Sequence, residues 1–401
     1  MKITAFAIFA ILILFYFPIA QSQSPVSVLY TGDPYPGHTP YIHMKVEPML
    51  AVTPIQASRD HYAGISDSDI KRAIRIYMPR TYDDLIETYD VLIISDSNVG
   101  SFTSEQHAWF PQSVADDGMG LAMFGGHETF GAATGHPDWG KAPIGKALPI
   151  ETIAGEYHDG KVEVQETDNV FMKSLPWRSD LDFLQNYASN LGVLREGAEM
   201  LAVDTIKSGR YAGYENPFYS TWKYQNGRTF AHTGDWTPGG GVVFLRWEYL
   251  PDFATNLMLY LSGRDIPEDL DLVHTVRSRF ATLGYRRLII DSLVDFVERF
   301  GANPKRVLDV IGEVDEARFE AQELYLELSF EEALDAVDNA LGLMDQAEIV
   351  AEDVKNDALL WVYLTEWLSV SGTALIVGFL LWTLMVRRRL YREVKTTTFR
   401  G

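Results

Sequence analysis

The chain has 401 residues, of which 47% are apolar and 22% charged. These fractions are typical of water-soluble globular proteins, so they exclude wholesale disorder and a bundle made mainly of membrane helices. The 55 acidic residues outnumber the 34 Lys and Arg residues, and the formal net charge of −21 would repel a nucleic-acid backbone. We therefore expect no nucleic-acid partner.

The sequence contains no cysteine. This absence excludes disulfides, thiolate metal sites and every mechanism that needs a cysteine nucleophile. The histidines are scattered and show no metal-ligand spacing. We therefore expect neither a metal nor a cofactor.

Residues 1–22 are expected to direct export. Lys2 precedes an uncharged apolar run from Ile3 to Ala20, and small polar residues follow it. Ala20 and Ser22 fit a signal-peptidase site after Ser22, but the run is also long enough to remain as a signal anchor. With Lys2 inside, both alternatives place the following residues outside the cytoplasm.

Residues 26–266 show the alternation of an α/β fold. Short β-rich apolar runs are separated by helical or loop stretches, which predicts a parallel sheet flanked by helices. Strands are expected at Ser27–Tyr30, Tyr89–Asp96, Gly120–Phe124, Lys161–Val164, Glu199–Val203, Ala212–Tyr214, Ser220–Tyr224 and Arg228–Thr233. Helices are expected at Asp69–Tyr77, Ser104–Ala115 and Phe253–Ser262. The hairpin signal Gln225-Asn226-Gly227 joins the last two strands.

Several sequence features of this region occur in a recognisable order. They are the strand ending at Gly32-Asp33, the run YDVLIISD, the passage DDGMGLAMFGG, the pair Phe130-Gly131, the run GKALPI and the later run NGRTFAHTGDW. In this order they resemble the glutamine amidotransferase-like family, a branch of the class I glutamine amidotransferase-like fold. The resemblance covers about residues 26–266 and implies that fold for them.

The resemblance also indicates where catalysis would take place. In active members of the fold, a cysteine on the turn after a central strand attacks the glutamine side-chain amide, with a histidine as base and a carboxylate that orients it. Here the turn reads Phe124-Gly125-Gly126-His127-Glu128 and holds no cysteine. Because no thiolate is present to form an acyl intermediate, we expect a pseudoenzyme without glutaminase activity.

Polar residues gather where the strands are expected to end, and ligands of such sheets lie beyond the carboxyl ends of the strands. We therefore expect a ligand-binding cleft formed by Asp33, Asp96, Asn98, Gly125, Gly126 and His127. The sequence does not identify its small-molecule ligand. The alternative is a membrane-tethered hydrolase in which His127, Glu128 and Asp235 replace the missing cysteine.

Two further patterns have both a functional and a structural interpretation. Gly125-Gly126 and Gly239-Gly240-Gly241 lack the Walker and dinucleotide-binding patterns, so we expect turns rather than phosphate sites. The aromatic residues between Tyr211 and Tyr224 could stack on a sugar or a peptide, but alternating aromatics are typical of packing within a sheet.

Residues 267–363 change to helical periodicity. One or two helices are expected at Asp269–Arg299, and another from Glu313 to about Tyr363, forming an antiparallel hairpin joined near Gly301 to Gly312. The apolar stripe of the second helix contains Phe330, Leu334, Val337, Leu341, Met344, Ala351, Val354 and Ala358. Between Asp309 and Asp357 there are sixteen acids and two bases. This acidic stalk has either a solvated face or a docking surface for a basic partner or cations.

A membrane helix is expected at residues 366–386. Trp367 to Val386 is uncharged and would be about 30 Å long as a helix, which matches the hydrocarbon core of a bilayer. Aromatic residues precede it, and the basic tail 387–401 follows it, which predicts a cytoplasmic C-terminus. The bilayer and other membrane proteins are therefore the expected partners of a cell-membrane protein that spans once, or twice if the N-terminal segment is uncleaved.

Overall fold

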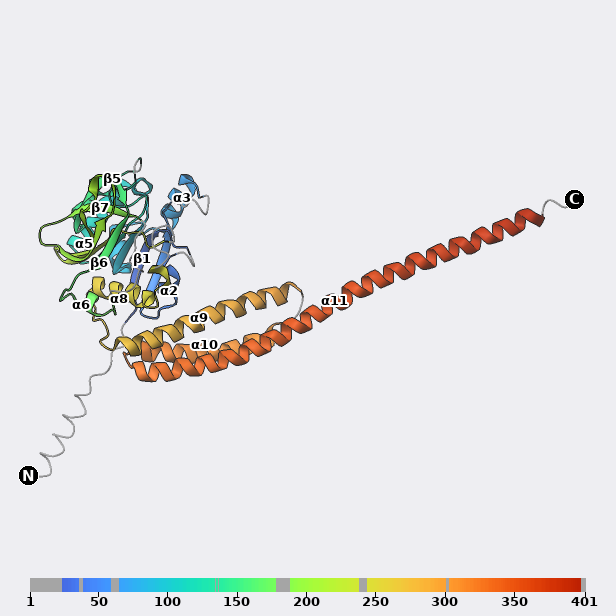
Figure 1. Cartoon of the computed structure of the whole chain (residues 1–401). Coiled ribbons are helices and arrows are strands. Elements are labelled where there is room, and N and C mark those ends of the chain that lie inside the picture. Colours follow the sequence, from blue (N-terminus) through green and yellow to red (C-terminus); the bar gives the residue numbers. More distant parts are fainter. Residues whose placement is uncertain are drawn as a thin grey trace, which may run out of the picture. The chain divides into compact units, whose positions relative to one another are not determined.

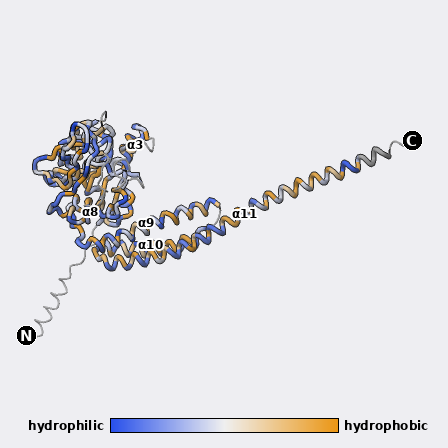
Figure 2. The backbone as a smooth tube through the Cα atoms, viewed as in Figure 1, coloured by the Kyte–Doolittle hydropathy of each residue, from blue (hydrophilic) through white to orange (hydrophobic). Residues whose placement is uncertain are grey.

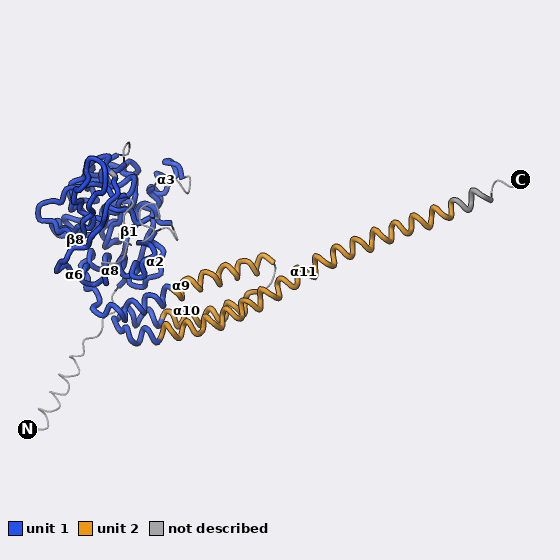
Figure 3. Tube along the Cα trace, viewed as in Figure 1, with its two compact units in different colours: residues 1–281, 320–335 blue, residues 282–319, 336–401 orange. Residues whose placement is uncertain are grey.

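The computed structural model describes residues 24–35, 39–58, 65–133, 135, 137–177, 188–237, 244–300 and 303–397. The chain forms two compact units, the first made of residues 1–281 and 320–335, the second of residues 282–319 and 336–401 (Figure 3). The expected N-terminal signal at 1–22 and the glycine run 239–241 lie outside the described residues.

The first unit is built on an eight-stranded sheet (Figure 1). Five neighbouring strands run parallel in the order β2-β1-β3-β4-β10, and β9, β8 and β6 continue the sheet antiparallel. The bounds are β1 Val26–Gly32, β2 Leu50–Gln56, β3 Val91–Ser95, β4 Gly120–Phe124, β6 Gly160–Val164, β8 Glu199–Ile206, β9 Glu215–Tyr224 and β10 Gly227–His232. A separate antiparallel pair joins β5 (Ile150–His158) and β7 (Ser189–Leu194).

Helices cover both faces of this sheet. On one face, buried side chains of α3 (Asp67–Tyr77), α4 (Tyr82–Thr88) and α5 (Ser104–Ala115) share a core with residues of β1, β3, β4 and β10. On the other, α8 (Leu250–Ser262) contacts β1, β3, β4 and β10, and also α2 (Tyr41–Val46) and α6 (Val170–Lys173). Short 3-10 turns are η1 Val99–Ser101, η2 Trp139–Lys141, η3 Pro143–Lys146, η5 Gly209–Tyr211 and η6 Phe244–Arg246.

Local sequence explains several of these boundaries. Thr81 and Thr103 form capping boxes with the third residue of α4 and α5, which satisfies the first backbone N–H groups of each helix. Gly263 ends α8 in a left-handed conformation, with φ of 77°. The expected α/β architecture, a mostly parallel sheet flanked by helices, is therefore confirmed.

Some expected elements differ from the structure. Ala212–Tyr214 is not a strand, because the chain turns there after η5 and β9 begins at Glu215. The edge strand β2 and the pair β5 and β7 were not predicted. For β2 the reason is local, because Leu50–Gln56 contains Pro54 and is only half-buried over most of its length. Proline is tolerated there because β2 lies at the edge of the sheet.

The C-terminal part forms three helices: α9 (Leu270–Arg299), α10 (Lys305–Leu326) and α11 (Phe330–Thr397). The expectation of one helix from Glu313 to about Tyr363 is therefore wrong. The helix breaks at residues 327–329, where Leu328 adopts a positive φ of 62°. The first connection is also shorter than expected, because α10 already begins at Lys305, whose amide donates a hydrogen bond to the Asn303 side chain.

The buried positions of α11 follow a heptad pattern. They are Ala333, Val337, Ala340, Met344, Ala347, Ala351, Val354 and Ala358, with alternating spacings of four and three. Leu334 and Leu341, which were assigned to the stripe from the sequence, are only half-buried. The buried face keeps Val337, Met344, Ala351, Val354 and Ala358 of the expected stripe, but Ala333 and Ala340 take the places of Leu334 and Leu341, and its alanines allow close helix packing.

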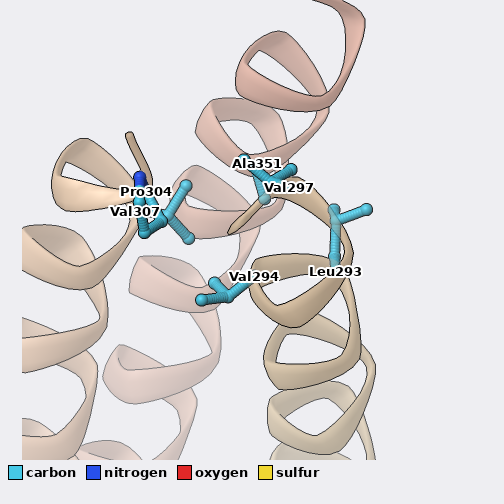
Figure 4. Close-up of a pocket in the computed structure, with 6 residues that line it drawn as sticks. All are labelled: Leu293, Val294, Val297, Pro304, Val307 and Ala351. Carbon is cyan, nitrogen blue, oxygen red and sulfur yellow. The ribbon is translucent and has the colours of Figure 1, made fainter. Parts of the chain in front are cut away.

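In the second unit, parts of α9, α10 and α11 pack on one another. Leu293, Val294 and Val297 of α9 form a shallow apolar surface together with Pro304, Val307 and Ala351 (Figure 4). Arg286 donates to Glu348 and Asp345 across this packing, both at 2.6 Å. The expected two-helix hairpin is thus extended by a third helical segment.

Beyond its heptad stripe, α11 continues into an apolar stretch with exposed Trp367, Leu375, Ile376, Phe379 and Leu380 (Figure 2). Among the described residues, α11 is the one helix long and apolar enough to cross a membrane. The expected membrane segment 366–386 lies within it.

Candidate functional site

Four neighbouring parallel strands end at one edge of the sheet. The carboxyl ends of β1, β3, β4 and β10 carry Asp33, Asp96, the pair Gly125-Gly126 and Asp235, and we call these residues the carboxyl edge. Asp33 and Asp235 are buried, at 4% and 7% exposure, whereas Asp96 is half-buried. Strand order therefore brings together three acids that are far apart in the sequence.

Asp33 lies in the most enclosed position of the three. Its Oδ1 accepts hydrogen bonds from Ser95 Oγ at 2.7 Å and from the Tyr30 hydroxyl at 3.3 Å. Burial raises the pKa of Asp33 well above its ordinary value, and the nearby charges of Asp96 and Asp235 raise it further. The three acids therefore form one electrostatically linked group.

Asp235 is fixed by the residue two positions later. Its two carboxylate oxygens accept from the Thr237 backbone amide and the Thr237 hydroxyl, both at 2.7 Å. Burial raises the pKa of Asp235 to about 6, although these two hydrogen bonds oppose the shift. Its carboxyl group therefore titrates close to neutral pH.

The turn after β4 has no space for a side chain at Gly125 or Gly126. A Cβ on Gly125 would lie 2.1 Å from the Thr233 carbonyl oxygen, and one on Gly126 would lie 2.3 Å from Asp96 Oδ1. Gly126 also has a φ of 148°, which disfavours other residues. Asn190 holds this turn, because its side chain accepts from the Gly126 amide at 3.0 Å and donates to the Gly126 carbonyl at 3.1 Å.

The next residues of the turn are held by residues that follow β3. The Glu128 amide donates to Asp96 Oδ1 at 2.7 Å, and Asn98 Nδ2 donates to Glu128 Oε1 at 2.7 Å. Asp96 itself has a positive φ of 39°. The Glu128 side chain is buried, whereas His127 is exposed. His127 is thus the side chain that this turn presents to solvent.

Trp236 packs beside the carboxyl edge. It is fully buried, its Nε1 donates to Ser95 Oγ at 2.6 Å, and its ring stacks on those of Phe124 and Tyr30. His232, the last residue of β10, lies among the rings of Phe124, Phe218, Tyr219 and Phe244. Burial lowers the pKa of His232 to about 3, so it is neutral at physiological pH.

The structure brings together part of the expected site. Asp33, Asp96, Gly125 and Gly126 lie at the carboxyl edge. Asn98 is linked to this edge indirectly, because it donates to Glu128, whose amide donates to Asp96. Of the expected catalytic set, Glu128 is bound to Asn98 and Asp235 to Thr237, whereas His127 is exposed. Sequence reasoning missed the roles of Ser95 and Asn190.

Chemically, this edge offers carboxyl groups and no thiol. Acids with raised pKa values can both donate and accept hydrogen bonds, and ionised acids attract cationic or hydrogen-bond-donating groups. Across the described residues, no group of three or more His, Asp or Glu side chains has the arrangement of a metal site.

No family model and no curated protein matches this sequence. Among solved structures, the cytoplasmic proteins STM1381 of Salmonella typhimurium LT2 and STM3548 of Salmonella typhimurium are similar, with TM-scores of 0.46 and 0.44. Both are 16% identical; the matches cover 59% and 58% of this chain, and 99% and 98% of theirs. A β-galactosidase from Rahnella sp. R3 has a TM-score of 0.31 and 16% identity, over 61% of this chain and 32% of the enzyme. At these TM-scores, the likeness assigns neither a family nor an activity.

Proposed function

We propose that this protein is a membrane-anchored binding component of a membrane complex, with an amidotransferase-like domain outside the cytoplasm that has no glutaminase activity. The observation that carries the proposal is the turn Gly125-Gly126. Neighbouring atoms close both positions to any side chain, at 2.1 Å and 2.3 Å from a built Cβ. A nucleophile at either position would therefore require the turn to move.

The surroundings of the turn support binding rather than catalysis. Trp236 fills the adjoining space with a buried ring, and the acids Asp33 and Asp235 are themselves buried. At this edge, solvent reaches the side chains of the half-buried Asp96 and the exposed His127. We therefore propose that a cationic or hydrogen-bond-donating group of a partner binds over Asp96 and His127.

The hydrolase alternative has less support from the geometry. It requires His127, Glu128 and Asp235 to act as one set, but the Glu128 carboxylate is engaged by Asn98 and that of Asp235 by Thr237.

Membrane attachment is the second part of the proposal. The apolar part of α11 and the arginines Arg387, Arg388 and Arg389 after it support a span at 366–386 with a cytoplasmic tail. The α/β domain would then lie on the opposite side of the membrane.

Site-specific photo-crosslinking in intact membranes tests the binding role. A photoreactive residue at position 127 should give a discrete adduct, and the same residue at Tyr77, which is 62% exposed on α3, serves as the matched surface control. Asp96→Lys should abolish the adduct because it reverses the local charge. Equal labelling at both positions, or an adduct unaffected by Asp96→Lys, would contradict the proposed binding surface.

A further inference from the structure

A buried ionic cluster lies within the first unit and shares no residue with the carboxyl edge. Its members are Glu47, between α2 and β2, Asp252 and Asn256 of α8, His274 and Arg277 of α9, and Tyr325 of α10. Helical spacing explains the arrangement, because residues three or four apart share one face of a helix. Asp252 and Asn256 therefore face α9 together, and His274 and Arg277 face α8. We call this set the Arg277 cluster.

Arg277 is the centre of the cluster. Its Nη1 donates to Asp252 Oδ1 and to Asn256 Oδ1, both at 2.9 Å, and its Nε donates to the Tyr325 hydroxyl at 2.9 Å. The same Nε lies 3.4 Å from Glu47 Oε2. One guanidinium thus connects the ends of α9 and α10 to α2 and α8.

His274 completes the charge balance. Asp252 and Glu47 carry two negative charges when ionised, and Arg277 supplies only one positive charge. His274 Nδ1 lies 2.6 Å from Asp252 Oδ2, so a protonated imidazole provides the second. Buried charges are costly unless they are compensated, so the state of His274 affects the whole cluster.

Solvent access distinguishes His274 from the other ionisable members. Its side chain is 23% exposed, whereas those of Asp252, Arg277 and Glu47 are 0%, 2% and 4% exposed. A proton can therefore reach the cluster from solvent through His274 without opening the core. Its ring also lies 4.2 Å from that of Tyr249, measured between centroids, which fixes its orientation.

We propose that the Arg277 cluster is a proton-controlled clasp, which holds the start of α9 and the end of α10 firmly onto α2 and α8 when His274 is protonated and loosens when it is neutral. This property is independent of the function proposed for the carboxyl edge. It makes the packing of residues 270–281 and 320–326 on α2 and α8 sensitive to the pH around the protein.

The groups around His274 raise its pKa on balance. The hydrogen bond to Asp252 is the largest influence and raises the pKa of His274, the charges of Asp252 and Glu248 raise it further, and burial and Arg277 lower it. A histidine with a raised pKa stabilises fully below its unfolded-state pKa, and this stabilisation is lost as pH rises through the folded-state pKa. Burial also raises the pKa of Glu47, so the contribution of Glu47 to stability is likewise lost as pH rises.

Hydrogen exchange of the full chain in detergent micelles, corrected for the intrinsic effect of pH, tests the clasp. Amides of residues 270–281 and 320–326 should lose protection as pH rises from about 6 to 8.5, relative to those of α5. The loss should be about tenfold for each unit by which folding raises the His274 pKa. His274→Gln should remove the dependence, and His107→Gln, on α5, should leave it unchanged.

Two results would overturn the proposal. Protection of these amides in the natural chain that does not change with pH would show that His274 does not control them, whatever the variants do. Equal pH dependence in the natural chain and in folded His274→Gln would assign the effect to another group.

Discussion

Gly126 lies directly against the side chain of Asp96, so close that a Cβ on this glycine would be 2.3 Å from Asp96 Oδ1. The acid that ends β3 therefore occupies the space into which a side chain from the turn after β4 would project. This relationship excludes a nucleophile at position 126 sterically, in addition to the absence of cysteine from the chain.

Gly126→Ala should destabilise the α/β unit by on the order of 3 kcal/mol, since it combines overpacking with a backbone conformation that disfavours other residues. Thermal unfolding of the full chain in detergent measures the change. Gly312→Ala is the matched control: no atom lies within 4 Å of its Cβ position in the exposed face of α10, so it should gain about 0.5–1 kcal/mol. An unchanged melting temperature for Gly126→Ala would mean that the turn is not closed.

Asp235 should make the unit less stable as pH rises. Its pKa is raised to about 6 on folding, so its contribution is fully present below the unfolded-state value of about 3.9 and is lost as pH rises through about 6. Asp235→Asn imitates the protonated acid and should flatten the stability profile between about pH 4 and 7. Urea unfolding at several pH values measures this. If Asp235→Asn keeps the full pH dependence of the unfolding free energy, that dependence belongs to other groups, and Asp33 would be the first to test.

The heptad stripe of α11 gives a matched pair of substitutions. Met344 is fully buried, so Met344→Ala should cost about 2–5 kcal/mol, whereas the half-buried Leu341→Ala should cost less. Asp345→Asn with Glu348→Gln should cost under about 1 kcal/mol each, because their ion pairs with Arg286 are largely exposed. Melting temperatures of the full-length variants test the order. A larger loss for Leu341 than for Met344 would place the core on the other face.

The membrane orientation predicts the fate of a C-terminal tag. Protease added outside intact cells or spheroplasts should digest the α/β domain and leave a tag after Gly401 protected, because the arginines that follow Val386 favour the cytoplasmic side. Permeabilised cells provide the control, in which the tag should be lost. Loss of the tag from sealed cells would reverse the orientation.

The sequence predicted those parts of the site that depend on strong local patterns. β1, β3, β4 and β10 are apolar runs that end in polar or glycine residues, so the positions of Asp33, Asp96 and Gly125-Gly126 followed from the parallel order of the strands. Asn190 was not predictable, because it is 64 residues from Gly126 and comes from the separate sheet of β5 and β7.

The helical part shows the same limit of local patterns. The break between α10 and α11 contains neither glycine nor proline, and Leu328 takes its positive φ without a local sequence signal. The Arg277 cluster was also missed, because it joins four segments from residue 47 to residue 325. Such sets depend on tertiary packing rather than on any one segment.

The most direct test of the proposed function is ammonia release from glutamine by the purified full chain in detergent. We predict no release above that of the buffer, because the chain has no thiol and its turn at Gly125-Gly126 has no space for a nucleophile. Release that disappears in His127→Ala would contradict the account, since it would establish catalysis at the turn that we assign to binding.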